Sequence, residues 1–424
     1  MRKVVGTLLG KSVAEAVKLR GKSGGQAIPG LVVETLVPGY LGVMLSQLPD
    51  GVVIVTGTNG KTTTTKMVVE LLQANGKRVL TNPTGSNLTR GIISTVSRQA
   101  KHGGKLPFDI AVFELDEAYA RQFTDVIKPR YVVGLNASRD QLDRFGEVDK
   151  IAELIIDTML CATEGIITNV DDVRLSKAVK ASPVPVDYFG VAPDLIKYFP
   201  CDEELVAVDT RSRKKRTEDM PVAVRLISFG EDKAVYEIKG KKAETKLQVT
   251  GQHNFQNAAA ALAIVSALLP EVRSLQLIEQ ISEVTPAFGR GQVFTLRNGS
   301  TVQLNLVKNP ASFRQGLASY VRPNVAIMIA INDRLADSRD MSWLWDVDFS
   351  SLQGRTIEVT SGSRAVDMAL RLHYEDIPTT TIELEMDDAV RQFCSLSNDK
   401  VIFASYTAML HLHGQLERRS GKSL

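Results

Sequence analysis

The chain has 424 residues, which at about 100–200 residues per domain predicts two to four domains, and its 44% hydrophobic content is enough to fill their cores. Its 51 Lys and Arg against 48 Asp and Glu give a formal charge of +3, too small for a dedicated nucleic-acid binder. Its three cysteines, Cys161, Cys201 and Cys394, form no C-x-x-C pair, which excludes a disulfide framework and a cysteine zinc site and favours a reducing cytoplasm. The sequence contains no run of about 18 apolar residues, so no membrane-spanning helix is expected.

Residues 1–45 are predicted to form an N-terminal helical segment. Apolar residues recur there at helical spacing among lysines and arginines, at Val4, Leu8, Val13, Val17 and Leu19. We interpret this basic amphipathic helix as packed on its own domain, which is the ordinary role of such a helix. Docking on a membrane surface is the alternative.

From residue 51 to about 172, short apolar runs alternate with helical patterns. The runs at 52–55, 78–81, 110–113, 131–134 and 166–167 are continuous rather than alternating. Continuous runs are typical of parallel strands covered by helices on both faces. The sequence therefore predicts an α/β fold with a central parallel sheet.

The stretch from about 195 to 250 is predicted to be a small antiparallel insertion, because residues 222–228 and 234–238 alternate with a period of two. A basic run at 211–216 is interpreted as a solvated loop. Residues 252–268 form an alanine-rich helix, and a break follows at 286–290. A second α/β pattern has strands at 325–331, 356–359, 381–384 and 401–403 and helices at 366–374 and 386–394. We place the domains at 46–296 and 297–424.

A glycine turn joins the run at 52–55 to a helix predicted over 64–73, which is the setting of a phosphate-binding P-loop. Gly57 and Gly60 let the backbone close around a phosphate, Lys61 reaches the β and γ phosphates, and the Thr62 hydroxyl holds Mg²⁺. The predicted nucleotide-binding residues of this loop are Gly57, Thr58, Asn59, Gly60, Lys61, Thr62 and Thr63.

The sequence G-T-N-G-K-T-T at 57–63 resembles the ATP loop of the Mur ligase superfamily. Further segments resemble that superfamily in the same order, at 82–87, 113–117, 136–143, 169–172, 251–257 and 288–292. Each lies at the C-terminal end of a predicted strand or at a helix start, the edge where ligands bind to parallel sheets. The resemblance implies that Glu114 binds Mg²⁺, that Asn257 meets the adenine and that Arg290 contacts the nucleotide.

Within the superfamily, residues from about 45 to 424 most resemble the MurT subunits of lipid II isoglutaminyl synthases. Gln141, in R-D-Q-L-D-R-F-G-E at 139–147, replaces the metal-binding histidine usual in amino-acid-adding ligases. The segments at 306–311, 331–349, 361–365 and 405–408 resemble the MurT-specific C-terminal domain.

Three features depart from the family. The central domain holds only Cys201 where a four-cysteine zinc ribbon is common, so no zinc is expected. Ser338 stands where glycine is expected. Neither Lys177 nor Lys180 sits in a motif that would mark the carbamoylated lysine of related ligases.

The resemblance implies an ATP- and Mg²⁺-dependent ligase that converts the D-glutamate α-carboxylate of the lipid II stem peptide to an amide through an acyl phosphate, with Lys61 and Glu114 as catalytic residues. A GatD-like class I glutaminase in a heterodimer supplies the ammonia. Asp340 is implied to complete its Cys–His triad; on the residues alone, we favour Asp340 as a helix N-cap. Core packing is the favoured role of the neighbouring Trp343 and Trp345, with an interface anchor as the alternative.

Two other functions stay open at this point. A stand-alone Mur-type amino-acid ligase or folylpolyglutamate synthase would need no partner, and a scaffold would bind nucleotide without chemistry. The intact Lys61, Thr62 and Glu114 argue against the scaffold. We expect a cytoplasmic protein that meets lipid II at the inner membrane face, with peripheral membrane contact left open.

Overall fold

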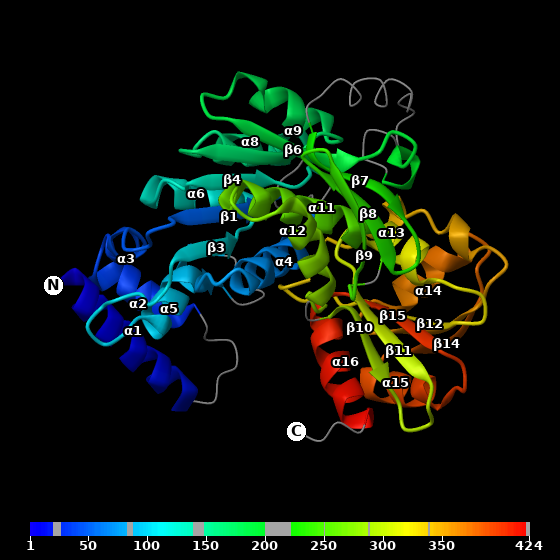
Figure 1. Ribbon diagram of the computed structural model, residues 1–424. Helices are drawn as coiled ribbons and strands as arrows, with labels where there is room; N and C mark the ends of the chain where they lie inside the picture. Colours follow the sequence, from blue (N-terminus) through cyan, green and yellow to red (C-terminus); the bar gives the residue numbers. More distant parts are fainter. Residues whose placement is uncertain are drawn as a thin grey trace. The chain divides into compact units, whose positions relative to one another are not determined.

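A computed structural model of the chain describes residues 1–19, 27–82, 88–138, 148–199, 222–249, 251–286, 289–337 and 340–420. They divide into two compact units. The first consists of Met1–Ala137, Asp149–Leu247 and Phe255–Val284, and the second of Ser138–Val148, Gln248–Asn254 and Thr285–Leu424. In Figure 1 the first unit runs from blue to green, and most of the second is yellow to red.

The first unit is built on a sheet whose described strands follow the order β2-β3-β1-β4-β5-β6-β7-β8-β9. These strands are β1 (Val52–Thr56), β2 (Val79–Thr81), β3 (Ile110–Glu114), β4 (Tyr131–Gly134), β5 (Gly165–Asn169), β6 (Val186–Val191), β7 (Val222–Phe229), β8 (Lys233–Ile238) and β9 (Lys241–Lys246). Neighbours from β2 to β7 are parallel, whereas β7, β8 and β9 pair antiparallel. Every residue of β1 and β5 is buried, as expected for strands covered on both faces.

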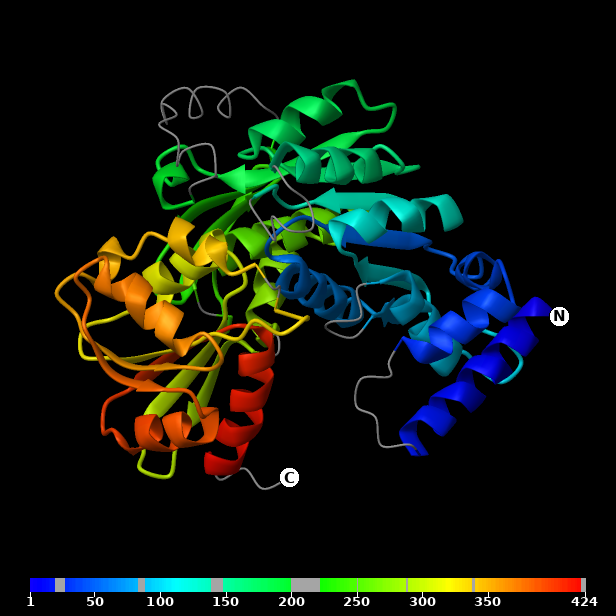
Figure 2. The same cartoon turned by 180° about the vertical axis from the view of Figure 1, so that it is seen from behind.

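Helices cover both faces of this sheet: α4, α11 and α12 lie in front of it in Figure 1, and α6 and α8 come forward in Figure 2. The helices are α4 (Lys61–Ala74), α5 (Thr89–Gln99), α6 (Glu117–Val126), α8 (Val148–Met159), α9 (Val173–Ala178), α11 (Gln252–Leu268) and α12 (Ser274–Gln280), with 3₁₀ turns η1 (Val179–Ala181), η2 (Ile196–Tyr198) and η4 (Ile281–Glu283). The run of alanines at 258–261 in α11 is completely buried. Such small side chains let a helix sit deep inside a unit.

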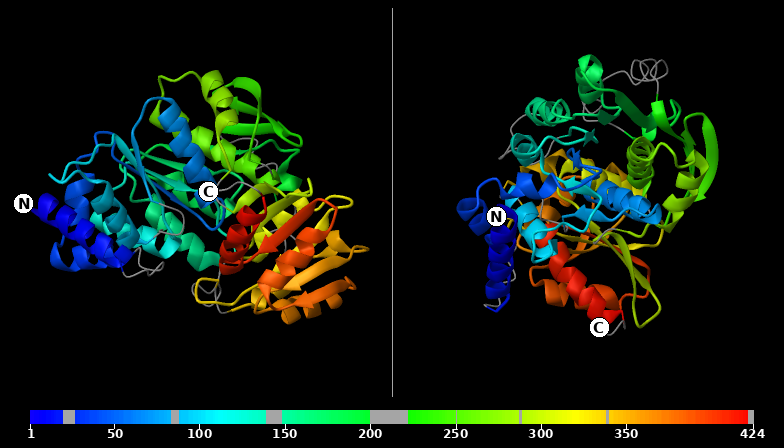
Figure 3. Two further views of the ribbon diagram at one scale, coloured as in Figure 1. Left: turned by 90° about the horizontal axis from the view of Figure 1, so that it is seen from below. Right: turned by 60° about the vertical axis from the view of Figure 1, so that its left-hand side comes forward.

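Three N-terminal helices, α1 (Arg2–Leu19), α2 (Ile28–Leu36) and α3 (Tyr40–Leu45), pack against one another and against α5 (Figure 3). Helix α1 therefore packs on its own domain, as interpreted, but the side that it buries consists of Gly6, Thr7, Gly10 and Ala14 and not of the predicted apolar residues. No helix in the described part of the chain has the length and apolar character needed to cross a membrane.

The second unit has a sheet of order β10-β11-β15-β12-β13-β14, antiparallel only between β10 and β11. Its elements are β10 (Arg290–Thr295), β11 (Thr301–Leu306), α13 (Pro310–Tyr320), β12 (Ala326–Ala330), η5 (Ser342–Asp346), η6 (Ser350–Leu352), β13 (Ile357–Ser361), α14 (Ala365–His373), β14 (Thr379–Glu383), α15 (Met386–Ser395), β15 (Lys400–Ala404) and α16 (Tyr406–Arg419). One apolar cluster contains Phe313 and Phe349, and another contains Phe393 and Leu412. The unit thus has a core of its own.

The predicted α/β class is confirmed. The nine strands predicted before residue 172 and after residue 320 match β1 to β5 and β12 to β15 to within a few residues. The sequence analysis did not predict β6, β9, β10 and β11. Strand β9 is K-K-A-E-T-K, which has no apolar alternation, and it forms only because β8 pairs with it. The basic run at 211–216 and Cys201 lie outside the described residues, and the domain limits at 46 and 296 stay a prediction.

Candidate active site

The loop after β1 has the backbone shape of a phosphate cradle. Gly57 has φ 128° and Gly60 has φ 84°, a region that favours glycine. A Cβ on Gly57 would lie 3.1 Å from the backbone nitrogen of Asn136, and one on Gly60 would lie 2.3 Å from Oδ1 of Asn257. Only glycine fits both positions, which explains the spacing of the motif. The second contact also places Asn257 of α11 directly against this loop. Its contact with the adenine stays a prediction.

Lys61 begins helix α4 and turns its ammonium group back over the loop. Its Nζ donates to the carbonyl oxygens of Gly57 at 2.5 Å and Thr58 at 3.3 Å, and it lies 3.2 Å from Oε1 of Glu117. Both Lys61 and Glu117 are buried. A buried ammonium needs such partners because burial of an unpaired charge costs several kcal/mol, on the order of 3–5. The lysine is therefore held at the phosphate cradle by its own loop and by the first turn of α6.

Thr62 and Glu114 meet at the carboxyl end of the sheet. The Thr62 hydroxyl donates to Oε1 of Glu114 at 2.8 Å. Asn82, at the end of β2, brackets the Glu114 backbone: its amide donates to the Glu114 carbonyl at 2.9 Å and accepts from the Glu114 N–H at 3.0 Å. A hydroxyl and a carboxylate beside a phosphate cradle form the oxygen donor set that Mg²⁺ prefers. The predicted metal ligands are thus adjacent, and the residues fit ATP with Mg²⁺.

Asn136, which follows β4, holds the other side of the loop. Its Oδ1 accepts from the Asn59 N–H at 2.9 Å, its side-chain amide donates to the Asn59 carbonyl at 3.1 Å, and its carbonyl accepts from the Thr58 N–H at 2.9 Å. Asp172, after β5, accepts from the Ala137 N–H at 2.8 Å and caps α9 through the Leu175 N–H. Hydrogen bonds therefore connect the segments that follow β1, β4 and β5. Thr63 is buried in the first turn of α4.

His253 and Arg290 lie in the second unit. His253 is half-buried, and the desolvation of its ring, with a smaller effect from the Arg290 charge, lowers its pKa from 6.5 to about 4. Gly251 in the same motif has φ 104°, and a Cβ there would lie 2.4 Å from the Tyr320 hydroxyl. Arg290 begins β10 beside Asn305 of β11. The role of Arg290 at the nucleotide stays a prediction.

Stability should fall in mild acid because of His253. The unfolded chain binds a proton at this residue below about pH 6.5, whereas the folded chain binds it only near pH 4. The neutral imidazole therefore contributes stability above pH 6.5 that is lost as the pH falls towards 4. We expect its share to drop by about 2 kcal/mol between pH 7 and pH 5. Urea unfolding of wild type and His253→Gln at both pH values measures this share; equal pH slopes would contradict it.

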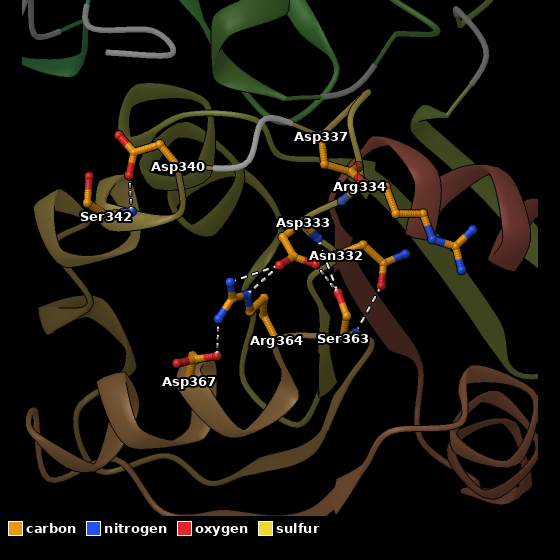
Figure 4. Close-up of polar contacts among 9 residues, drawn as sticks. All are labelled: Asn332, Asp333, Arg334, Asp337, Asp340, Ser342, Ser363, Arg364 and Asp367. Atoms are coloured by element: carbon orange, nitrogen blue, oxygen red, sulfur yellow. Dashed lines mark hydrogen bonds and ion pairs between the residues drawn. The ribbon is translucent and has the colours of Figure 1, made fainter. Parts of the chain in front are cut away.

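Asp340 lies in the second unit just before η5, and Figure 4 shows it on a separate stretch of chain from the neighbouring polar cluster. One carboxylate oxygen accepts from the Ser342 N–H at 2.9 Å. The N-cap of η5 is Met341, so Asp340 supports the turn without being its cap residue. The side chain is half-buried.

A cluster of polar residues lies after the end of β12, in the stretch of chain that precedes Asp340 (Figure 4). Asp333 accepts from Ser363 at 2.7 Å and from Arg364 at 2.9 Å, and these contacts, the serine first, lower its pKa below the usual 3.8. Buried Asp337 accepts from the Thr407 N–H at 2.7 Å and from its hydroxyl at 2.5 Å. Asp337 is thus committed to a structural contact. Ser338 lies outside the described residues.

The two tryptophans have different surroundings. Trp343 is buried with Phe313 and Phe349, so its predicted core role is confirmed. Trp345 is 53% exposed and touches the Tyr374 ring edge-on, with the Arg371 guanidinium 5.4 Å from its own ring centre. Arg371 is buried and donates to the carbonyl oxygens of Leu344 and Val347 at 3.3 and 2.9 Å. It ties η5, and therefore the segment after Asp340, to α14.

Glu117 is a site residue that the sequence analysis missed. It is the third carboxylate of the 113–117 segment. A carboxylate in the first turn of a helix usually interacts with the helix dipole, so the residue pattern offers no reason to pair it with a lysine. Asn82 was predicted only as part of its segment. The rest of that segment, at 83–87, lies outside the described residues, as do residues 139–147 with Gln141.

Residues 55–265 match the model of the Mur ligase middle domain, and residues 306–409 match the MurT ligase C-terminal model. The lipid II isoglutaminyl synthase (glutamine-hydrolyzing) subunit MurT of Streptococcus pneumoniae is 30% identical over 99% of this chain and 98% of its own length. The fold is similar to MurF of Acinetobacter baumannii, with a TM-score of 0.69 and 17% identity over 91% of this chain and 80% of that one. It is also similar to MurF ligase of Thermotoga maritima in complex with ADP, with a TM-score of 0.63 and 18% identity over 90% of this chain and 83% of that one.

Proposed function

Since the chain belongs to the MurT family of the Mur ligase superfamily, we propose that it is the ATP-dependent amidating subunit of a lipid II isoglutaminyl synthase. In this role it converts the D-glutamate α-carboxylate of the lipid II stem peptide to an amide, with ammonia from a GatD-like glutaminase in a heterodimer. The observation that carries the proposal is the meeting of Lys61, Thr62 and Glu114 at one end of the first unit's sheet.

The residues present support activation of a carboxylate. Ammonia does not displace hydroxide from a carboxylate, because hydroxide is a poor leaving group. ATP supplies the γ-phosphoryl group that turns the carboxylate into an acyl phosphate. Lys61 carries a positive charge to the cradle, and Thr62 with Glu114 would hold Mg²⁺, which would offset negative charge on the transferred group. Gly57 and Gly60, with their positive φ values, let the loop backbone turn tightly at the cradle.

The second unit offers a surface for a glutaminase. Asp340 is half-buried, with one oxygen bonded to Ser342, so the carboxylate has capacity for a further hydrogen bond. Exposed apolar residues follow on η5 and α14, namely Trp345, Val366, Leu370 and Tyr374. Exposed aromatic residues near a polar group are typical of protein interfaces. We propose that Asp340 orients the partner's catalytic histidine there.

The nitrogen source distinguishes this function from a stand-alone ligase. The isolated chain with ATP, Mg²⁺, lipid II and high ammonium should yield the amide, and a glutaminase should strongly stimulate the rate at neutral pH. An amino-acid ligase or folylpolyglutamate synthase would instead add an amino acid without a partner. Product mass identifies the outcome, and addition of an amino acid would overturn the proposal. The proposal includes a cytoplasmic site of action and no zinc.

Glu114→Ala should lower ammonium-driven amidation by about 10²-fold, because Mg²⁺ loses a carboxylate ligand beside the developing charge. Glu114→Gln, which keeps the hydrogen bond from Thr62, separates charge from packing and should lose nearly as much. The measurement is the amidation rate over a range of Mg²⁺ concentrations. A wild-type rate at ordinary Mg²⁺ would show that Glu114 has no part in metal binding.

A further inference from the structure

Helix α1 packs on its unit through its small residues. A Cβ on Gly6 would lie 2.2 Å from the Tyr40 ring, and one on Gly10 would lie 2.4 Å from the Ser97 hydroxyl. The Thr7 hydroxyl bonds to that of Tyr40 at 2.8 Å. Substitution of larger residues on this side would push the helix away, so the rotation of α1 about its axis is fixed.

Helix α2 packs in the same way on the same support. A Cβ on Gly30 would lie 1.8 Å from the Arg90 carbonyl oxygen, and the Gly30 N–H donates to the Ser94 hydroxyl at 2.7 Å. Ser94 and Arg90 belong to α5, as does the Ser97 that Gly10 of α1 approaches. Gly10 of α1 and Gly30 of α2 therefore both face α5, and the opposite sides of the two helices face away from it.

The sides that face away carry large aliphatic residues. Val5 and Leu8 of α1 are 46% and 45% exposed, and on α2 Ile28, Leu31 and Leu36 are 44%, 41% and 65% exposed. We call these five residues the N-terminal apolar surface. A helix usually buries its large apolar residues against its own domain. Here they are left to solvent, which is the signature of a surface that meets another apolar phase.

The charges bordering this surface are mostly positive. Arg2 and Lys11 make no ion pair with a carboxylate among the described residues. The two carboxylates of these helices are already engaged, Glu15 with Lys18 at 2.7 Å and Glu34 with Arg90 at 2.6 Å. A second copy related by twofold symmetry would set cations against cations. Anionic headgroups above an acyl layer match both the apolar and the basic part.

We propose that the N-terminal apolar surface docks α1 and α2 on an anionic membrane, with both helices lying in the plane of the lipid headgroups. Cations at the border contact the headgroups, and the aliphatic side chains enter the boundary with the acyl chains. This inference does not rest on the amidation chemistry, since it uses only the first helices of the first unit.

Vesicle sedimentation of the full chain, without ATP or substrate, tests this docking. Wild type should bind vesicles of phosphatidylglycerol and phosphatidylcholine, and it should bind much less to pure phosphatidylcholine or at high salt. The double variant Val5→Asp/Leu8→Asp should bind at least about tenfold more weakly. Leu410→Asp is the matched control, because Leu410 is 44% exposed on helix α16, and it should bind like wild type.

Three results would overturn the docking. Wild type could fail to sediment with anionic vesicles, or the double variant could bind them like wild type. Light scattering without lipid could also show a dimer that the double variant dissociates while vesicle binding is absent, which would assign the surface to self-association. Thermal unfolding of both variants confirms that they are folded, because the substituted side chains are exposed.

Discussion

Lys61→Ala should abolish ATP-dependent amidation, by at least about 10³-fold, whether ammonium or glutamine supplies the nitrogen. Both routes need the activated carboxylate, and the variant loses the ammonium group that lies 2.5 Å from the Gly57 carbonyl in the phosphate cradle. Lys66→Ala is the matched control: Lys66 lies on the same helix, is half-exposed and pairs with Glu70 instead of the loop. The measurement is amide formation under both nitrogen sources.

The buried ion pair of Lys61 with Glu117 means that the stability of Lys61→Ala must be measured with its activity. In Lys61→Ala this carboxylate loses a partner, so the variant should also be less stable. Thermal unfolding shows whether the variant is folded. The rate of glutamine hydrolysis by the partner in the complex shows whether the variant still docks. If a folded variant keeps most of its ammonium-driven rate, the loop has no part in the reaction.

Asp340→Asn should separate the two half-reactions. The substitution keeps the side-chain size and the hydrogen bond from the Ser342 N–H but removes the negative charge that would stabilise a partner imidazolium. Glutamine hydrolysis in the complex should fall on the scale of about 10⁴, as for a neutralised triad aspartate in a serine protease. Amidation at high ammonium should survive, because Lys61, Thr62 and Glu114 belong to the other unit.

Asp348→Asn is the control for this result. Asp348 follows η5 in the chain, but its carboxylate accepts from the Ser350 N–H at 2.9 Å, and this contact lowers its pKa. It should leave both rates close to wild type. If Asp340→Asn lowers both rates together, Asp340 has only the structural role at the start of η5. If it lowers neither, the triad carboxylate is another residue, and Asp346 is the next to test, since Asp337 is held by Thr407.

The phosphate loop was predictable because its determinants are local. A buried apolar strand, two glycines with positive φ and a lysine at a helix start stand next to one another in the chain. The contact of Lys61 with Glu117 depends on how β1, β3 and α6 align, and no local pattern encodes that alignment. Asn257 could be assigned to the site only through the family resemblance, because it comes from a helix almost 200 residues later in the chain.

Edge strands and helix rotations were harder to predict. Strand β9 consists mainly of charged residues, and the large apolar residues of β10, Val293 and Phe294, are adjacent, so neither strand shows apolar alternation. For α1 the apolar spacing predicted a helix but suggested that its large residues face inward. In the structure Val4, Leu8 and Leu19 are exposed, because Gly6 and Gly10 allow an approach that larger residues would block. Similarly, Trp343 and Trp345 are two positions apart in a 3₁₀ turn, and only one of them can reach the core.

The central claim is that this chain activates a carboxylate as an acyl phosphate. Lipid II carrying ¹⁸O in the D-glutamate α-carboxylate tests it most directly, with the chain, ATP, Mg²⁺ and ammonium. Displacement of phosphate by ammonia breaks the bond between the carbonyl carbon and the bridging oxygen, so each amide formed should leave one ¹⁸O in inorganic phosphate. Amide formation with unlabelled phosphate would contradict the claim.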